Sequence, residues 1–563
     1  MNNNQTEIQA FNEQEYKATV GGYKPLGIAG TQMAIFSLMN KQIHLRSPSE
    51  LKELNLKALL GVRWCEDNFT DYDERKEEFF FNHRRLASAL IADCQFCGPY
   101  SEAMERKVGV WKMDDGQLVI NGDRLWRPDG TLLEHGMHEG RVYPETGSIG
   151  FDLSTDAASH DEVNKVLGAF NSPQWIHPMA GELILGYIGV GIVSVALKRR
   201  PHVLMTGPAA CGKSTVLNYV RQLMGNLAYA CTGPQTMAAF YQSLGGTSKV
   251  VVNDEFEADP TRKSCKDTFD VARASYSLQE GDAGIVRGTV TGKSKSYRFY
   301  SPFIAAGISP GKMEPADLTR WVVLEAKGKP SGARLTDAEA RDLGPKLARL
   351  FISRWDVFCA SEDVVRQCIL DAGGDGRLAD TVGTLLASYW AFVSPTPATE
   401  DDAKSLVGLL GIEERIALHE VNDGQQCFES LTSRVLPFKV LCGPALVTRP
   451  LSVGQAIGMV CKEPTEQPEV VTRLAQLGLR VALSQGKWVL YVVCSPSHVE
   501  ARKLFSGTKW SLGGWSTVLR RLPGGSESTQ RIGAGFGASK VTVIDIPEHM
   551  RSADDYMDMR LAA

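Results

Sequence analysis

The sequence predicts a multidomain α/β protein whose central domain carries a glycine-rich loop between a strand and a helix. Three observations support this prediction. The chain has 563 residues, which is too long for one hydrophobic core and corresponds to about three or four domains. The stretch HVLMTGPAACGKSTVLNYV (202–220) has the pattern of an apolar strand, a loop and an amphipathic helix. Patterns typical of helices and of short strands alternate on either side of it.

The composition is that of an ordinary globular protein, with 43% hydrophobic and 22% charged residues. The net charge of -4 excludes a strongly basic surface, so nucleic-acid contacts would have to come from local patches. The twelve cysteines follow no regular spacing, which favours free thiols in a reducing compartment. Cys94 and Cys97 form a C-x-x-C pair that suits either zinc or a buried helix face, and the lack of a second pair favours the helix.

The hydrophobic pattern favours a cytoplasmic protein without membrane contact. The chain opens with the polar stretch MNNNQTEIQAFNEQEY, which does not resemble a signal peptide. The most apolar run, residues 183–197, has 15 residues and three glycines, whereas a membrane span needs about 20 residues. We therefore expect this run to form a buried helix beneath the sheet of the central domain.

Changes of pattern along the chain suggest its domain organisation. The stretches QMAIFSLMNKQI and HRRLASALIADC have helical spacing, whereas DG, NGD and PDG turns follow residue 107 at short intervals. Near the end, RPLSVGQAIGMV, PEVVTRLAQLGLRV and KWVLYVVC indicate helix, helix and strand, an order that winged helices share with other small α+β modules. We expect a mainly helical N-terminal region (1–106), a small β-rich subdomain with a linker (107–171), a central α/β domain that contains the glycine-rich loop (172–330), a helical region (331–440) and a winged-helix-like α+β domain (441–563).

The loop GPAACGKS has the spacing G-x-x-x-x-G-K-[ST] of a P-loop. Its two glycines allow backbone N–H groups to point at phosphate oxygens, and the next helix directs its positive end at the same anion. Lys213 would reach the β- and γ-phosphates of ATP, and Ser214 would bind Mg²⁺. The alternative is a glycine-rich turn without a ligand. The predicted nucleotide-binding residues are Gly207, Pro208, Ala209, Ala210, Cys211, Gly212, Lys213, Ser214 and Thr215.

The next candidate site is the acidic end of an apolar strand, KVVVNDEFE (249–257). Asp254 would hold Mg²⁺ together with Ser214, and Glu255 would orient and deprotonate the attacking water. A hydrolysing pair argues against a small-molecule kinase, which must keep water out, and favours a motor or switch ATPase. A purely structural acidic strand end remains an alternative.

A basic hairpin is predicted in GIVRGTVTGKSKSYRFY (284–300), with its tip at residues 291–295. Lysines at such a tip suit a phosphodiester backbone because they supply charge without base preference, although lysines also keep hairpin edges soluble. The predicted DNA-binding residues are Lys293, Lys295 and Arg298. The strand that follows places Ser309 as a candidate γ-phosphate sensor. Arg320 precedes the next strand, where it is either a catalytic arginine directed at a neighbouring subunit or a surface residue.

This order of motifs resembles the ATPase half of phage and prophage primase-helicase proteins, which are relatives of superfamily III helicases within the AAA+ group. The stretches ALKRRPHVLMTGPAACGKST, VGVWKMDDGQLVINGD and LFSGTKWSLGGWSTVLRRLPG are similar to that family, so the resemblance covers much of residues 107–545. It implies an AAA+-like core and a ring-shaped homo-oligomer, expected to be a hexamer, that threads single-stranded or forked DNA in the bacterial host cytoplasm. The implied catalytic residues are Lys213, Asp254, Glu255 and Arg320, the last acting in trans.

Two features depart from the family pattern. The sensor strand ends in AAGIS, where many relatives have an asparagine, so Ser309 would have to substitute for it. The acidic stretch Asp71-Tyr72-Asp73 lacks a preceding apolar strand and a partner histidine. We therefore expect priming or loading to belong to a separate protein.

The leading hypothesis is an ATP-dependent DNA helicase or translocase that serves replication of a phage or mobile element. The alternative is a non-motor AAA+ ATPase that acts as a DNA-binding initiator or assembly switch. A packaging or defence ATPase also remains open.

Overall fold

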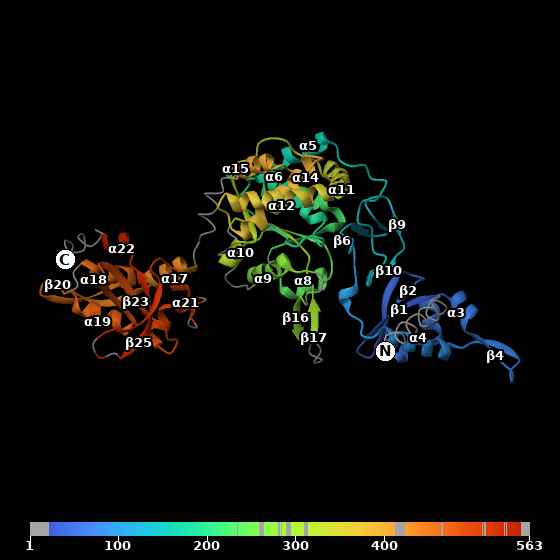
Figure 1. Cartoon of the computed structure of the whole chain (residues 1–563), viewed down its shortest axis with the longest axis horizontal. Helices are drawn as coiled ribbons and strands as arrows, with labels where there is room; N and C mark the ends of the chain where they lie inside the picture. The colour runs from blue at the N-terminus through green and yellow to red at the C-terminus, as the bar shows by residue number, and fades with distance from the viewer. Residues whose placement is uncertain are drawn as a thin grey trace, which may run out of the picture. The chain divides into compact units, whose positions relative to one another are not determined.

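A computed structural model gives the structure of the chain and describes residues 22–552 apart from 234, 258–263, 280–281, 283, 289–293, 309–312, 411–422, 463–464, 509, 512–513, 534 and 536. The chain divides into two compact units, Met1–Ile412 and Glu413–Ala563 (Figure 1). None of the helices within the described ranges is both long and apolar enough to cross a membrane.

The N-terminal part of the first unit contains strands as well as helices. Its elements are β1 (Tyr23–Ala29), β2 (Gln32–Ser37), β3 (Gln42–Arg46), η1 (Pro48–Glu50), α2 (Glu53–Leu60), α3 (Val62–Phe69), β4 (Thr70–Asp73), β5 (Glu78–Phe81), α4 (His83–Cys97) and η2 (Glu102–Met104). The expectation of a mainly helical region is therefore wrong for residues 23–46, which form a three-stranded antiparallel sheet. The central strand β2 is buried almost throughout, and a short apolar run of this kind fits a strand or a helix equally well.

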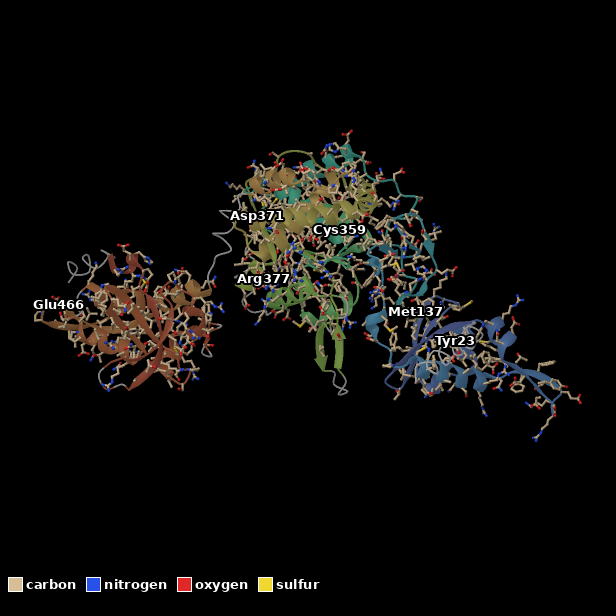
Figure 2. All side chains as sticks on the ribbon, in the orientation of Figure 1. Tyr23, Met137, Cys359, Asp371, Arg377 and Glu466 are labelled. Atoms are coloured by element: carbon tan, nitrogen blue, oxygen red, sulfur yellow. The ribbon has the colours of Figure 1, made fainter. Side chains whose placement is uncertain are left out.

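Helix α4 has the helical form that its spacing predicts, and it packs against β1. In this core the buried Tyr23 donates its hydroxyl to Asp93 Oδ2 at 2.7 Å and lies edge-on to Trp64 (Figure 2). Cys94 faces the core whereas Cys97 is exposed. Across the described residues, no cluster of three or more His, Cys, Asp or Glu side chains has the arrangement of a metal site.

Short strands and a capped helix lead into the central domain. These elements are β6 (Gly109–Lys112), β7 (Leu118–Asn121), β8 (Leu125–Trp126), β9 (Leu132–Leu133), β10 (Gly136–His138), β11 (Arg141–Tyr143) and α5 (His160–Phe170). Strands β6 to β9 form one antiparallel sheet. Ser159 and Glu162 form a capping box at the start of α5, which satisfies backbone N–H groups at the first turn.

The central sheet has six strands in the order β12-β19-β13-β18-β15-β14. Its strands are β12 (Gln174–Trp175), β13 (His202–Thr206), β14 (Ala228–Thr232), β15 (Val250–Asp254), β18 (Phe303–Ala306) and β19 (Trp321–Lys327). All but β12 are parallel to their neighbours. The connecting elements are α7 (Lys213–Met224), η3 (Gly225–Leu227), α8 (Met237–Leu244), α9 (Ser264–Ser277), α10 (Pro315–Leu318) and the hairpin of β16 (Ile285–Gly288) and β17 (Ser294–Tyr297).

Helices cover both faces of this sheet, so its inner strands β13, β15 and β18 are largely buried. Side chains of α8 and α9 join these strands in one apolar cluster, and α7 contacts β15 and β18. The predicted buried helix is α6 (Ala180–Ile192), which is almost entirely inaccessible to solvent. A Cβ atom at its Gly186 would lie 2.0 Å from the Leu385 carbonyl oxygen, so glycine is needed for the close approach of α6 to its neighbour α14 (Thr384–Val393).

A helical region follows the sheet. It contains α11 (Asp337–Ser353), α12 (Trp355–Asp371), α13 (Gly376–Leu378), the π-helix η4 (Ala379–Gly383), α14 (Thr384–Val393) and α15 (Glu400–Leu409). The predicted end of this region at residue 440 is wrong, because that position lies inside a strand of the second unit. The helix before that strand belongs to the second unit as well, since its Cys427, Phe428 and Leu431 are part of the C-terminal core.

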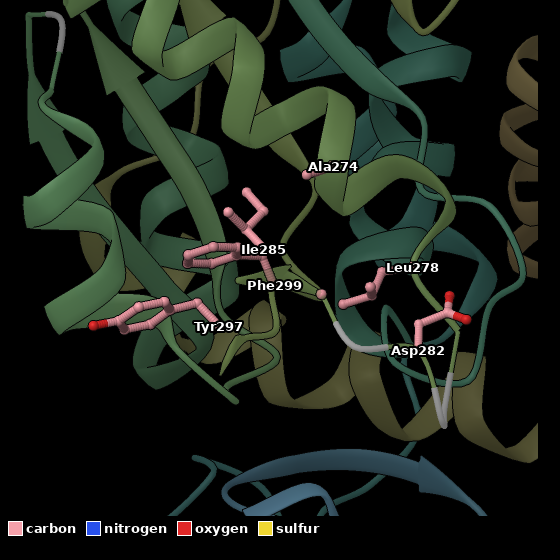
Figure 3. A pocket seen from close by; sticks show the side chains of 7 residues that line it. Ala274, Leu278, Asp282, Ile285, Tyr297 and Phe299 are labelled. Atoms are coloured by element: carbon pink, nitrogen blue, oxygen red, sulfur yellow. The ribbon is translucent and has the colours of Figure 1, made fainter. Parts of the chain in front are cut away.

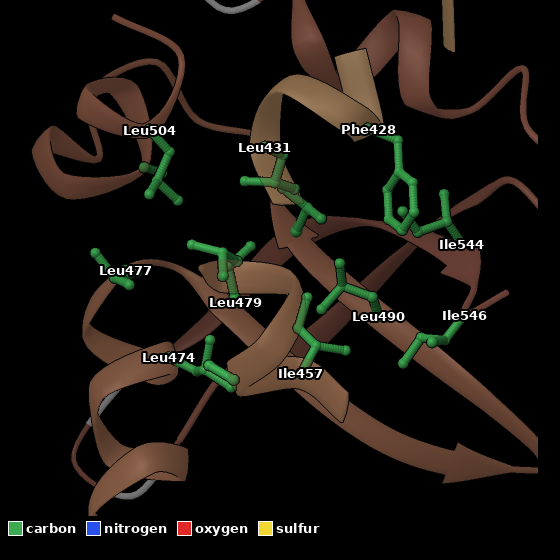
Figure 4. Close-up of a cluster of buried hydrophobic side chains, with 14 of the residues drawn as sticks. Phe428, Leu431, Ile457, Leu474, Leu477, Leu479, Leu490, Leu504, Ile544 and Ile546 are labelled. Atoms are coloured by element: carbon green, nitrogen blue, oxygen red, sulfur yellow. The ribbon is translucent and has the colours of Figure 1, made fainter. Parts of the chain in front are cut away.

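The second unit is an α+β fold around a core of its own (Figure 4). Its elements are α17 (Asp423–Thr432), β20 (Val435–Cys442), β21 (Ala445–Ser452), α18 (Val453–Lys462), α19 (Pro468–Gln476), β22 (Leu479–Ser484), β23 (Lys487–Val493), α20 (Val499–Leu504), α21 (Trp515–Leu519), β24 (Ser526–Arg531), β25 (Ala538–Asp545) and α22 (Glu548–Ser552). The order α18, α19, β22, β23 agrees with the predicted helices and strand. Four of the strands form a sheet with the order β22-β23-β25-β24, which extends beyond a single hairpin, and β20 and β21 form a separate antiparallel pair.

Two buried polar side chains tie β13 to the rest of the central domain. The Arg200 guanidinium donates to the carbonyl oxygens of Ser275 (3.1 Å) and Leu278 (2.8 Å) at the end of α9, and it lies over the Tyr300 ring. His202 Nε2 bonds to the Ala272 carbonyl oxygen at 2.8 Å, and its Nδ1 accepts the Phe303 N–H at 3.1 Å. The imidazole is therefore neutral, because a protonated Nδ1 has no lone pair with which to accept.

Burial lowers the pKa of His202 from 6.5 to about 3. In acid, the unfolded chain takes up a proton at this imidazole while the folded chain does not, so stability is lost as the pH falls below 6.5. Between about pH 7.5 and about pH 5, we expect the wild type to lose about 2 kcal/mol of unfolding free energy relative to His202→Gln, which cannot titrate. Hydrogen exchange of peptides spanning β13 measures this difference, and an equal pH dependence in both proteins would contradict it.

Candidate active site

The loop between β13 and α7 depends on backbone conformations that favour glycine. Gly207 has a φ of +137° and Gly212 a φ of +98°, and Ala210 between them also has a positive φ. A Cβ atom at Gly207 would lie 2.4 Å from the Ala326 carbonyl oxygen of β19. Neither glycine can therefore be replaced without displacing the loop. The exposed residues of the loop and of the first turn of α7 are Pro208, Ala209, Ala210, Ser214 and Thr215.

Lys213 opens α7 and points back into this loop. Its Nζ donates to the carbonyl oxygens of Gly207 (2.7 Å) and Pro208 (2.8 Å) and lies 3.4 Å from Cys211 Sγ. The lysine is only 8% exposed and Cys211 only 1%. The ammonium group is thus enclosed by neutral oxygens without a carboxylate among these bonding partners, so its charge is available to attract an anion.

The end of β15 brings a carboxylate to the loop. Ser214 Oγ donates to Asp254 Oδ1 at 3.1 Å, and the same oxygen accepts the Glu255 N–H at 2.9 Å. Glu255 is exposed and has a φ of +54°, a conformation that is uncommon for a residue with a side chain and that often marks functional sites. Serine hydroxyl and carboxylate oxygens are the ligand types that Mg²⁺ takes, so the donor set fits this ion.

The structure brings together Lys213, Ser214, Asp254 and Glu255, as the sequence predicts, and it adds two polar residues that the sequence reasoning missed. Glu257 accepts the N–H of Ile308 through Oε1 and so joins the ends of β15 and β18. Asn253 is 1% exposed, and within the part of the chain that the structure describes neither atom of its amide has a hydrogen-bond partner. Both residues come after the apolar run 250–252 of β15, which is the signal that could have identified them. The sensor candidate Ser309 lies outside the described residues.

Arg320 lies at the opposite edge of the sheet from the loop. It precedes β19, whose first residue Trp321 pairs with His202, the first residue of the parallel strand β13. At about 3.3 Å per residue, the length of β13 separates Arg320 from the loop of its own chain. Its guanidinium bonds to the Ala316 carbonyl oxygen and lies 5.5 Å from the centre of the Tyr276 ring. Partial burial lowers the pKa of Arg320.

The hairpin between β15 and β18 carries the predicted DNA-binding residues. Lys295 lies on β17 opposite Arg287 of β16, whereas Lys293 lies outside the described residues. Arg298 lies at the base of the hairpin, where its Nε donates to the Asp282 carbonyl oxygen at 2.8 Å. Arg298 therefore braces the start of the hairpin and is not part of its tip.

Comparisons with known proteins do not assign a family. No protein-family model matches the chain, and no curated protein matches it. It is similar to a solved structure described as the apo structure of the NrS-1 C terminal region (305–718), with a TM-score of 0.33, 10% identity, and coverage of 94% of this chain and 98% of the other. A second structure, the A form apo structure of the NrS-1 C terminal region, has a TM-score of 0.29, 12% identity, and coverage of 78% and 98%. A likeness of this size identifies no function.

The geometry of the loop predicts that Gly207→Ala destabilises it. The substitution forces a Cβ atom against Ala326 O and costs about 1–3 kcal/mol for the strained backbone. We expect faster hydrogen exchange in peptides covering residues 207–213 and a lower unfolding temperature of the first unit. Gly147→Ala is the matched control, because a Cβ atom there meets no neighbour and the φ of Gly147 lies outside the left-handed region. Equal exchange in both variants would show that the loop tolerates a side chain.

Proposed function

We propose that this chain is an ATP-dependent DNA helicase or translocase that acts as a ring-shaped homo-oligomer in phage or mobile-element replication. One observation carries the proposal. Lys213, Ser214, Asp254 and Glu255 meet at one edge of a parallel sheet, and a hairpin with a basic sequence is inserted between the acidic strand and the next strand of the same sheet.

The loop side chains support binding of a nucleoside triphosphate. Phosphate oxygens would compete with the Gly207 and Pro208 carbonyls for the Lys213 ammonium, because a charged acceptor binds more strongly than a neutral one. Ser214 and Asp254 would hold Mg²⁺, which neutralises charge on the phosphate oxygens when bound. Glu255, exposed beside this pair, would orient and deprotonate the attacking water. β18 lies between β13 and β15 in the sheet. The segment that follows β18 would therefore sense both the phosphate-binding loop after β13 and the acidic end of β15.

The position of Arg320 supports a ring. Because Arg320 lies at the far edge of the sheet, it cannot reach the loop of its own chain. In an oligomer of copies arranged head to tail, that edge meets the loop edge of a neighbour. An arginine there would stabilise charge on the transferred phosphoryl group.

The first test measures ATP hydrolysis and strand displacement in the same set of variants. We expect the purified protein to hydrolyse ATP faster with single-stranded DNA and to separate a forked duplex. Lys213→Ala should abolish both activities, since it removes the phosphate-binding cation. Lys293→Ala combined with Lys295→Ala should abolish displacement and leave basal hydrolysis, since those lysines contact the DNA backbone. Hydrolysis that is indifferent to DNA, without displacement, would favour the alternative of an initiator or assembly switch.

The second test examines the trans role of Arg320. Arg320→Ala and Lys213→Ala should each be nearly inactive, because an arginine of this kind contributes about 10³–10⁵ in rate. When the two variants are mixed, about a quarter of the interfaces combine an intact Lys213 with an intact Arg320 from the neighbour. We therefore expect partial recovery of ATP hydrolysis in the mixture. An absence of recovery, with mixed oligomers verified by pull-down of differently tagged chains, would contradict the ring arrangement.

A further inference from the structure

A cavity lies at the base of the β16–β17 hairpin (Figure 3), and its lining includes none of Lys213, Ser214, Asp254 and Glu255. Its volume is about 340 Å³, within the range of ligand pockets. The residues that line it are Ala274, Leu278, Asp282, Gly284, Ile285, Tyr297 and Phe299. It is formed by α9, by the segment leading into the hairpin and by the two strands themselves, so whatever it binds is held by the hairpin.

Two aromatic side chains form a braced wall of this cavity. Tyr241 of α8 stacks on Tyr297, with ring centres 4.3 Å apart and planes 13° apart, and on Phe299, at 5.4 Å and 22°. Tyr241 does not line the cavity, so its stacking holds the two rings in place from outside the lining. Phe299 is only 1% exposed, so the half-buried Tyr297 presents the ring on which a flat ligand can stack.

The charged groups at the cavity are Asp282 and Arg298. The lining residues that the structure describes include neither lysine nor arginine, but Arg298 lies beside them, since its Nε donates to the Asp282 carbonyl oxygen. In Figure 3 the Asp282 carboxylate points away from the apolar side chains, and its Oδ2 accepts the Gln279 N–H at 2.8 Å. A phosphate group would therefore pair with Arg298 outside the apolar lining, where it keeps part of its hydration, whereas a flat, weakly polar ring would be accommodated inside it.

We propose that this cavity holds one nucleobase of the single strand that the hairpin binds, by stacking and without reading the identity of the base. The inference rests on the proposed DNA-binding role of the hairpin. Stacking on aromatic side chains tolerates any base because every base has a flat π-face. The phosphodiester backbone stays outside the cavity, near the basic hairpin, while one base enters. Each advance of the hairpin would then move a base together with its phosphates.

The experiment uses a thymine oligonucleotide that contains one 2-aminopurine, mixed with the full chain in the absence of ATP. Stacking in the cavity should quench the 2-aminopurine fluorescence. Ala274→Phe fills the cavity, so we expect it to abolish the quenching and to weaken oligonucleotide binding about tenfold in fluorescence anisotropy. Ser277→Phe is the matched control, because it adds the same side-chain volume at an exposed position of α9 that does not line the cavity. This control should behave as the wild type does.

A second variant covers the case in which Ala274→Phe does not fold. Tyr297→Leu keeps an apolar side chain but removes a stacking ring, and it should also abolish the quenching. Equal quenching in the wild type, Ala274→Phe and Tyr297→Leu would overturn the proposal. The proposal would also be overturned if the protein quenched the free 2-aminopurine nucleoside and Ala274→Phe left the affinity for the oligonucleotide unchanged. The ligand of the cavity would then be a free nucleoside. If the quenching depends on the cavity but the protein does not displace strands, base binding in the cavity is supported and only the proposed helicase activity is refuted.

Discussion

The parallel register of five strands in the central sheet is the constraint on which the candidate site depends. Helices cover the inner strands β13, β15 and β18 on both faces, so the polar side chains of these strands stand at the strand ends. Because β13, β15 and β18 run in the same direction, the segments that follow them leave from one edge. Lys213, Ser214 and Asp254 meet there without being close in sequence, and the segments before the strands, including Arg320, lie at the other edge.

The buried Arg200 extends this constraint to the hairpin. Its guanidinium stands at the start of β13 and bonds to the carbonyl oxygens at the end of α9. One of these belongs to Leu278, whose side chain lines the cavity at the base of the hairpin. Burial lowers the pKa of Arg200 to about 10, so it keeps its charge at neutral pH. These hydrogen bonds are costly to break in an interior without water. A shift of β13 would therefore move the end of α9, and with it the Leu278 side chain that lines the cavity.

Local pattern predicted part of this structure and long-range contacts decided the rest. The strand, loop and helix around Gly207 and Lys213 follow from residue spacing, because turn chemistry and amphipathic periodicity are local properties. The run MAIF in β2 has no periodicity that separates strand from helix, and only pairing with β1 and β3 settles it. The partners of Lys213 and the braced rings of Tyr297 and Phe299 depend on contacts between distant segments. No pattern in a single stretch of sequence reports such contacts.

The ends of β15 and β18 are joined in a way that the family resemblance does not anticipate. The resemblance places an asparagine after the sensor strand, whereas this chain has AAGIS there. In the structure a carboxylate from the acidic strand, Glu257, takes the N–H of Ile308. The chain's asparagine lies instead on β15, where Asn253 is buried and its amide has no hydrogen-bond partner among the described residues. The acidic end of β15 is joined to β18 by the backbone ladder, by the Phe256 N–H that donates to the Ala306 carbonyl oxygen, and by Glu257. The position of Asp254 is therefore fixed by backbone pairing and by a carboxylate three residues further on, because the asparagine amide makes none of these bonds.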